Sequence, residues 1–154
     1  MEATVRRELP MILIRVIVGL VFVLEGALKF VLPEELGAGR FALIGLPLPH
    51  ALAPLIGGVE ICGGVLVLLN FYAGDAALAL LAVILGALVT TKVPILLERP
   101  LGPFALSRLN HYGVLSFFHE ARVDLLILFG LVAILIDSGL RMGRRRPWYQ
   151  SKGL

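Results

Sequence analysis

The fold class is decided by residues 11–32, which read MILIRVIVGLVFVLEGALKFVL. The hydrocarbon core of a bilayer is roughly 30 Å thick and needs about 20 apolar residues in a helix, and this stretch meets that length. A secretory signal peptide has a shorter apolar region and ends at a small-residue cleavage site, whereas this stretch is long and contains Arg15, Glu25 and Lys29. We therefore expect a retained transmembrane helix.

Three further stretches are apolar over a similar length, namely residues 51–72, 76–97 and 121–140. Only residues 70–75 connect the second helix to the third, which predicts a tight antiparallel hairpin. Hydrophobic residues make up 58% of the 154 positions, more than a soluble domain can cover with polar side chains. The sequence predicts an all-α integral membrane protein, a single domain over residues 1–154 whose four helices form an antiparallel up-down-up-down bundle.

Basic residues are concentrated near the two ends of the chain. Arg6 and Arg7 precede the first apolar stretch, and the basic tail 141–154 follows the last one. The positive-inside rule therefore predicts that both termini are cytoplasmic and that the chain crosses the inner (cytoplasmic) membrane several times. Residues 98–120 mix polar and aromatic side chains, so we expect them to lie at the opposite membrane interface.

Charged residues inside the apolar stretches mark the candidate site. A central charge costs on the order of 2.5–3.5 kcal/mol on insertion scales, so such residues seldom face lipid. When depth is measured at about 1.5 Å per residue from the non-cytoplasmic end of each helix, they share one half of the bilayer. They are Glu25, Lys29, Glu60, Lys92 and Asp124, with Arg122 nearby. We expect them to pair inside the bundle, either as a ligand or proton site or as a clasp that only fixes helix register.

Helix periodicity predicts which way part of this cluster points. Glu25 and Lys29 are four residues apart and share one helix face. Gly57, Glu60 and Gly64 recur at spacings of three and four, which places the carboxylate on a stripe of small residues where another helix can approach closely. We therefore expect Glu60 to point into the bundle.

The remaining polar residues have simpler interpretations. His111, His119 and Glu120 are secondary candidates for the site, but they form no compact metal-ligand motif, and no metal is expected. Cys62 is expected to be a small buried filler. Asp137 precedes Arg141 by four residues, which predicts a pair at the helix end.

Several of these segments together resemble the DoxX family of small four-helix membrane proteins. They are Arg15-Val-Ile-Val-Gly19, Glu25-Gly-Ala-Leu-Lys29-Phe30, Gly45-Leu-Pro-Leu-Pro49 and Gly57-Gly-Val-Glu60-Ile-Cys-Gly-Gly64. The Glu120-Ala-Arg-Val-Asp124 opening of the last helix is similar to a form found in some members. The resemblance implies a membrane partner of oxidoreductases, since the family name comes from the small subunit of a thiosulfate:quinone oxidoreductase.

Three functions follow from the cluster and the resemblance. The first is a membrane subunit of a quinone-linked oxidoreductase or respiratory-type complex, in which the charged cluster near the non-cytoplasmic face serves as a quinone or proton site. The others are a binder or carrier of a small amphipathic molecule, and a non-catalytic structural or assembly subunit. No covalently bound cofactor is expected, so a quinone is the expected ligand and an accessory subunit is favoured over an enzyme acting alone. The expected partners are membrane lipids and other redox-complex subunits. Nucleic acid is not expected, because the net charge of +3 lies in the tails.

Overall fold

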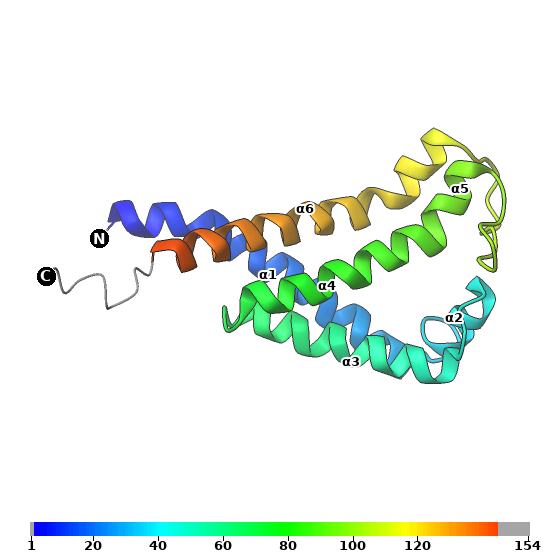
Figure 1. The fold of residues 1–154 in the computed structure, drawn as a ribbon, viewed down its shortest axis with the longest axis horizontal. Coiled ribbons are helices and arrows are strands. Elements are labelled where there is room, and N and C mark those ends of the chain that lie inside the picture. The colour runs from blue at the N-terminus through cyan, green and yellow to red at the C-terminus, as the bar shows by residue number, and fades with distance from the viewer. Residues whose placement is uncertain (1, 145–154) are drawn as a thin grey trace, which may run out of the picture.

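The computed structural model describes the backbone of residues 2–144 and the side chains of residues 8–139, and this part of the chain is helical (Figure 1). Its elements are α1 (Glu2–Val31), α2 (Ala38–Ile44), α3 (Pro49–Leu68), α4 (Ala73–Ala87), the π-helix η1 (Leu88–Lys92), α5 (Val93–Leu97) and α6 (Val114–Arg144). Within the described ranges, an isolated antiparallel bridge joins Leu101 to Phe104 in the segment between α5 and α6. The prediction of an all-α chain is confirmed.

Within the described residues, three helical segments are long and apolar enough to cross a membrane. They are Glu8–Val31, Pro49–Leu68 and Ala73–Leu97, with mean hydropathies of 2.4, 2.0 and 2.3. The third runs through α4, η1 and α5 without a break. Residues 121–140, the fourth expected span, lie inside α6. Most of the basic tail, from residue 145 onward, lies outside the described residues.

Two stretches between the expected spans are helical where none was predicted. Residues 38–44 form α2, and α6 begins at Val114, so the last part of the expected interfacial loop 98–120 belongs to that helix. Gly113 has a φ of 92°, a conformation that glycine adopts without strain, and its carbonyl accepts a hydrogen bond from Phe117 N–H at 2.9 Å. This turn starts α6 ahead of the apolar run.

Helices α1 and α3 pack with their backbones in close approach. A Cβ atom on Gly26 would lie 2.6 Å from the Gly57 carbonyl oxygen, and one on Gly64 would lie 2.7 Å from the Gly19 carbonyl oxygen. Real Cβ contacts are longer, so only glycine permits this spacing. The expected stripe of small residues on the second span is therefore a helix–helix contact.

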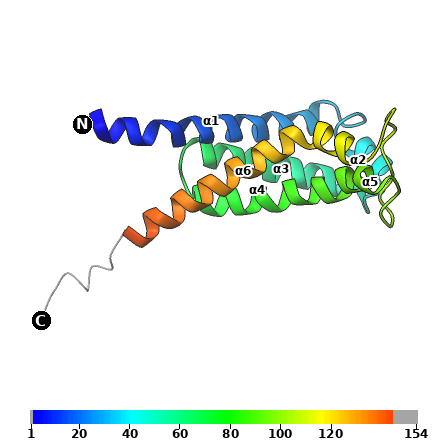
Figure 2. The same cartoon turned by 90° about the horizontal axis from the view of Figure 1, so that it is seen from above.

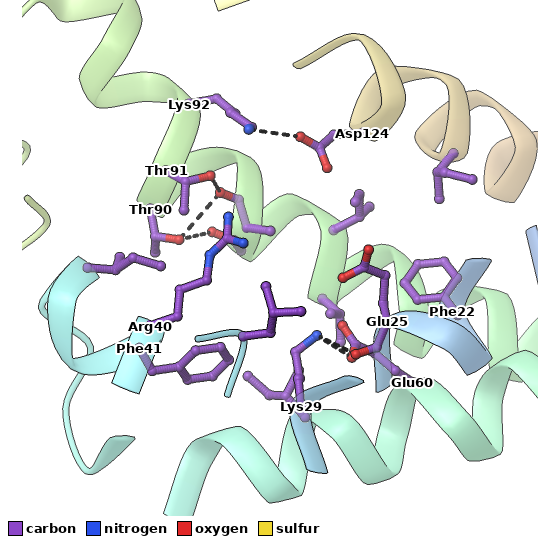
Figure 3. A pocket seen from close by; sticks show the side chains of 18 of the residues that line it. Phe22, Glu25, Lys29, Arg40, Phe41, Glu60, Thr90, Thr91, Lys92 and Asp124 are labelled. Atoms are coloured by element: carbon purple, nitrogen blue, oxygen red, sulfur yellow. Dashed lines mark hydrogen bonds and ion pairs between the residues drawn. The ribbon is translucent and has the colours of Figure 1, made fainter. Parts of the chain in front are cut away.

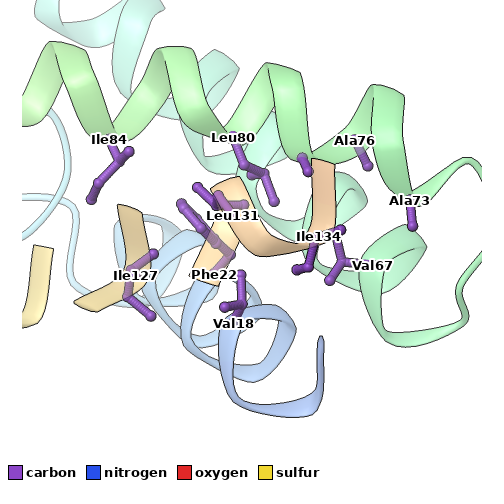
Figure 4. Close-up of a cluster of buried hydrophobic side chains, with 11 residues drawn as sticks. Val18, Phe22, Val67, Ala73, Ala76, Leu80, Ile84, Ile127, Leu131 and Ile134 are labelled. Carbon is purple, nitrogen blue, oxygen red and sulfur yellow. The ribbon is translucent and has the colours of Figure 1, made fainter. Parts of the chain in front are cut away.

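The hydrophobic core joins this pair of helices to α4 and α6 (Figure 4). Its most buried side chains include Val67, Leu80, Leu131 and Ile134, all at 0% exposure. Helix α6 crosses α4 obliquely (Figure 2). The α3–α4 turn and the start of α1 lie at one end of the molecule, whereas α2 and α5 lie at the other (Figure 1). The candidate site is at the end that carries α2 and α5.

Candidate functional site

A cavity of about 510 Å³ lies between α1, α2, α3, α4–η1 and α6 (Figure 3). The charged residues that line it are Glu25, Lys29, Arg40, Glu60, Lys92 and Asp124. Apolar side chains that line it include Val21, Phe22, Phe41, Ile44, Ile56, Val83, Ile84 and Ile127. The cavity therefore combines a large apolar wall with equal numbers of acidic and basic side chains, so it offers both apolar and polar contacts to an amphipathic molecule.

The first ion pair in the cavity joins α1 to α3. Lys29 Nζ donates to Glu60 Oε2 at 2.6 Å, and the two side chains are only 10% and 6% exposed. The ammonium group also donates to the Glu25 carbonyl oxygen at 3.3 Å. Glu60 points into the molecule, as predicted, and its position between Gly57 and Gly64 is what brings it close to α1.

The second ion pair joins η1 to α6. Lys92 Nζ lies 3.6 Å from Asp124 Oδ2, with the side chains 15% and 24% exposed. This separation is longer than a direct charged hydrogen bond, so the pair is looser than the one between Lys29 and Glu60. The sequence indicated that these residues lie at similar depth, but it did not indicate which acid pairs with which base.

The π-helix η1 shapes this wall of the cavity and was not predicted. Pro94 has no N–H and its ring clashes with the carbonyl four residues earlier, so a regular α-helix cannot continue through it. The chain widens instead, and Val93 N–H bonds to the Leu88 carbonyl oxygen, five residues back. Thr90 and Thr91 donate to the carbonyl oxygens of residues 86 and 87 at 2.9 and 2.6 Å. Pro94 within an apolar stretch was the signal for this distortion.

Glu25 differs from the other carboxylates of the cavity. Glu60 and Asp124 each face a lysine, whereas no described residue forms a hydrogen bond or ion pair with the Glu25 side chain. Glu25 is exposed and projects into the cavity in Figure 3. Its carboxylate is close enough to interact electrostatically with the carboxylates of both Glu60 and Asp124. The cavity therefore contains one free carboxyl group close to two paired ones.

The other predicted site residues lie away from the cavity. Arg122 is exposed and donates to the carbonyl oxygen of His119 on its own helix. His111 and His119 are exposed, and Glu120 does not line the cavity. Among the described residues, no three His, Cys, Asp or Glu side chains are grouped to hold a metal ion.

One further expectation needs correction, and another falls partly outside the described residues. Cys62 is exposed on the outer face of α3, so the prediction that it is a buried filler was wrong. Helix rotation explains this, since the face that carries Glu60 and Gly64 is the one turned toward α1. Asp137 pairs with Arg15 of α1 at 2.5 Å, an interhelical contact that its spacing from Arg141 did not predict. The side chain of Arg141 is outside the described residues.

The apolar helices and the charged cavity between them define a helical membrane protein with an internal polar site. Within that class, the chain belongs to the DoxX family, whose family model matches residues 11–93. It is 44% identical over 124 residues to the uncharacterized membrane protein Rv3486 of Mycobacterium tuberculosis (strain ATCC 25618 / H37Rv), a match that covers 80% of this chain and 72% of that protein. No solved structure matches the chain. The resemblance that the sequence motifs indicated is confirmed.

Proposed function

We propose that this chain is the membrane subunit of a quinone-linked oxidoreductase and that the cavity binds the quinone headgroup. In this proposal α6 is the fourth membrane span, both termini are in the cytoplasm, and the cavity lies near the non-cytoplasmic face of the inner membrane. The observation that carries the proposal is the free carboxyl group of Glu25 in a cavity where Glu60 and Asp124 are already paired.

The residues present fit a quinone headgroup. Its ring is flat and apolar, and Phe22, Phe41 and Ile127 offer apolar surface on three different helices. Its oxygens need hydrogen-bond partners, and Glu25 has no other partner among the described residues. A quinone, when bound, supplies redox chemistry that takes up or releases protons. Glu25 would hold or release a proton at its carboxyl group. The nearby Lys29–Glu60 pair would help to stabilise the charge on that group.

The paired charges also support a second candidate function. The Lys29–Glu60 pair satisfies both groups at 2.6 Å and links α1 to α3, which is what a purely structural clasp requires. A scaffold subunit would need no more than this. Glu25 separates the two candidates, because a clasp gives no reason for an unpaired carboxyl group in the same cavity.

Purification in mild detergent, followed by lipid extraction and chromatography, tests the proposal. We expect a quinone to co-purify with the protein or its complex. The variant Glu25→Gln should bind a short-tailed hydroquinone about 10 to 100 times more weakly, because a hydroquinone O–H group then loses its charged carboxylate acceptor. Its melting temperature should equal that of the wild type, since the Glu25 side chain forms no hydrogen bond or ion pair with a described residue.

Glu35→Gln is the matched control for this experiment. Glu35 is exposed at the same end of the molecule but does not line the cavity, so its replacement should leave quinone binding unchanged. If no quinone co-purifies and Glu25→Gln behaves like Glu35→Gln in binding and in quinone-linked activity, the scaffold function is correct instead.

A further inference from the structure

Arg40 is a cavity residue that lies between the first two expected spans, 11–32 and 51–72. It belongs to α2, and its guanidinium group projects into the cavity (Figure 3). Among the described residues it forms no hydrogen bond or ion pair, although its charge reaches Asp124 electrostatically. An arginine near a membrane surface normally extends toward water or lipid headgroups, so an inward direction calls for a cause.

The direction of Arg40 follows from the way α2 is held. Ala38 and Phe41 are buried against Ala53 of α3, which fixes one face of the short helix. The Ile44 carbonyl oxygen accepts a hydrogen bond from Ala105 N–H at 2.8 Å, which ties the end of α2 to the segment after α5. Gly45 turns the chain there with a φ of 91°.

The start of α2 is held as firmly as its end. A Cβ atom on Gly37 would lie 2.5 Å from the Lys29 carbonyl oxygen, so the chain before α2 is pressed against the end of α1. The helix therefore has little freedom to rotate, and Arg40 is held at the cavity by packing on both sides.

Within the part of the chain that the structure describes, the charged residues of the cavity include one cation and one anion without partners. Lys29 is paired with Glu60 and Lys92 lies beside Asp124, so Arg40 and Glu25 remain. The two enter from different helices, α2 and α1 (Figure 3). Arginine can only donate hydrogen bonds, whereas a carboxylate only accepts them. A ligand that satisfies both must carry two separate polar atoms on one small apolar body.

We propose that Arg40 and Glu25 together select a headgroup with two ring oxygens, in which Arg40 donates to one oxygen and Glu25 bonds to the other. This inference rests on the proposed function and adds the rule by which the cavity distinguishes its ligand. A 1,4-hydroquinone satisfies the rule, since one hydroxyl oxygen can accept from Arg40 while the other hydroxyl donates to the Glu25 carboxylate; a quinone satisfies it when the Glu25 carboxyl group carries a proton. A phenol with the same tail lacks one of the two oxygens and leaves either Arg40 or Glu25 unpaired.

The test compares a decyl-substituted 1,4-hydroquinone with the decyl phenols that lack either hydroxyl. Dissociation constants are measured anaerobically by equilibrium dialysis on the full-length protein in nanodiscs. Wild type should prefer the hydroquinone by about 10 to 100 times, the effect of one hydrogen bond to a charged group. Arg40→Gln should remove the preference over the phenol that lacks the oxygen facing residue 40, because the glutamine variant loses the charged donor.

Arg99→Gln is the matched control, since Arg99 is exposed near α5 and does not line the cavity. It should retain the wild-type preference. If Arg40→Gln also retains that preference while wild type binds hydroquinone, the role of Arg40 is refuted and the proposed function stands. If wild type binds none of these compounds, the proposed function fails and this inference fails with it.

Discussion

At the scale of single residues, three interhelical ion pairs join the helices of the described part of the chain. Lys29 pairs with Glu60, and Lys92 lies beside Asp124, at the cavity end of the molecule. Arg15 is 4% exposed, and its Nη2 atom donates to Asp137 at 2.5 Å on the far side of the hydrophobic core. Its Nε atom is buried and has no hydrogen-bond partner among the described residues. Each pair joins two helices, so each charge contributes to holding the helices in register.

The Lys29–Glu60 pair should show the stability signature of a buried ion pair. Replacing Glu60 alone with leucine leaves the ammonium group unpaired at low exposure, and we expect a loss of about 3–5 kcal/mol in the free energy of unfolding. The double variant Lys29→Met with Glu60→Leu should recover most of that loss, because neither member of the pair is then left as an unpaired buried charge. The free energies of unfolding of the wild type, the single variant and the double variant are measured in mixed micelles.

Glu25→Leu provides the comparison for this experiment. Glu25 lies on the same face of α1 as Lys29 but pairs with no described residue, so its replacement should change the stability little. If Glu60→Leu is as stable as Glu25→Leu, the two groups are not coupled in the membrane.

At the scale of helices, close packing and a local distortion position the cavity. The glycine contacts between α1 and α3 bring Glu60 within reach of Lys29. The π-helix η1 widens the third apolar segment just before Pro94 and places Thr90, Thr91 and Lys92 along the cavity wall. The glycine contacts and the π-helix are both features of the backbone, and both determine which side chains lie next to one another in the cavity.

Gly64 should tolerate no larger residue. A Cβ atom there would lie 2.7 Å from the Gly19 carbonyl oxygen and 3.0 Å from Val23 N, both of which are backbone atoms. Gly64→Ala must therefore push α1 and α3 apart, and we expect a loss of about 1–3 kcal/mol together with weaker quinone binding. Thermal unfolding and ligand titration measure the two effects.

Gly58→Ala makes the same chemical change on the same helix without the contact. A Cβ atom on Gly58 meets nothing within 4 Å, and alanine favours a helix by about 1 kcal/mol over glycine. Its melting temperature should be unchanged or higher. Equal destabilisation by the two alanine variants would show that α1 and α3 do not pack this closely.

At the scale of the whole molecule, the two ends have different characters. One end holds the α3–α4 turn and the start of α1, and the other holds α2, α5 and the cavity (Figure 1). The apolar core with the Arg15–Asp137 pair occupies the region between the first end and the cavity. A ligand in the cavity would therefore be separated from the cytoplasmic side that the proposed orientation assigns to the first end.

Cysteine labelling of intact cells tests that orientation and the fourth span. In a Cys62→Ala background, single cysteines at Glu35 and Arg108 should react with an impermeant maleimide, because both side chains are exposed at the cavity end. Cysteines at Phe71, in the α3–α4 turn, and at Gln150, in the basic tail, should react only after permeabilisation.

The position at Gln150 tests whether α6 crosses the membrane, since Arg108 precedes that helix in the sequence and Gln150 follows it. Labelling of Gln150 in intact cells, with Phe71 protected, would mean that α6 does not cross. Labelling of Phe71 and protection of Glu35 would reverse the orientation of the whole chain.

The sequence by itself determined the helical membrane class, three of the spans and the inward direction of Glu60. Apolar length and helical periodicity are properties of a continuous stretch, so they can be read without knowing what lies beside it. The same reasoning predicted that Glu25, Lys29, Lys92 and Asp124 lie at similar depth in the bilayer. It could not name their partners, because pairing depends on how the helices rotate against one another.

Only the tertiary structure decided the composition of the cavity. Arg40 lies in a stretch too short to predict a helix, and it reaches the cavity because α2 is packed against α3 and the segment after α5. Arg122 shares the first turns of the last span with Asp124, yet the rotation of α6 directs it to the exterior. A side chain enters a cavity only when the elements around it fix its direction, and those elements are distant in the sequence.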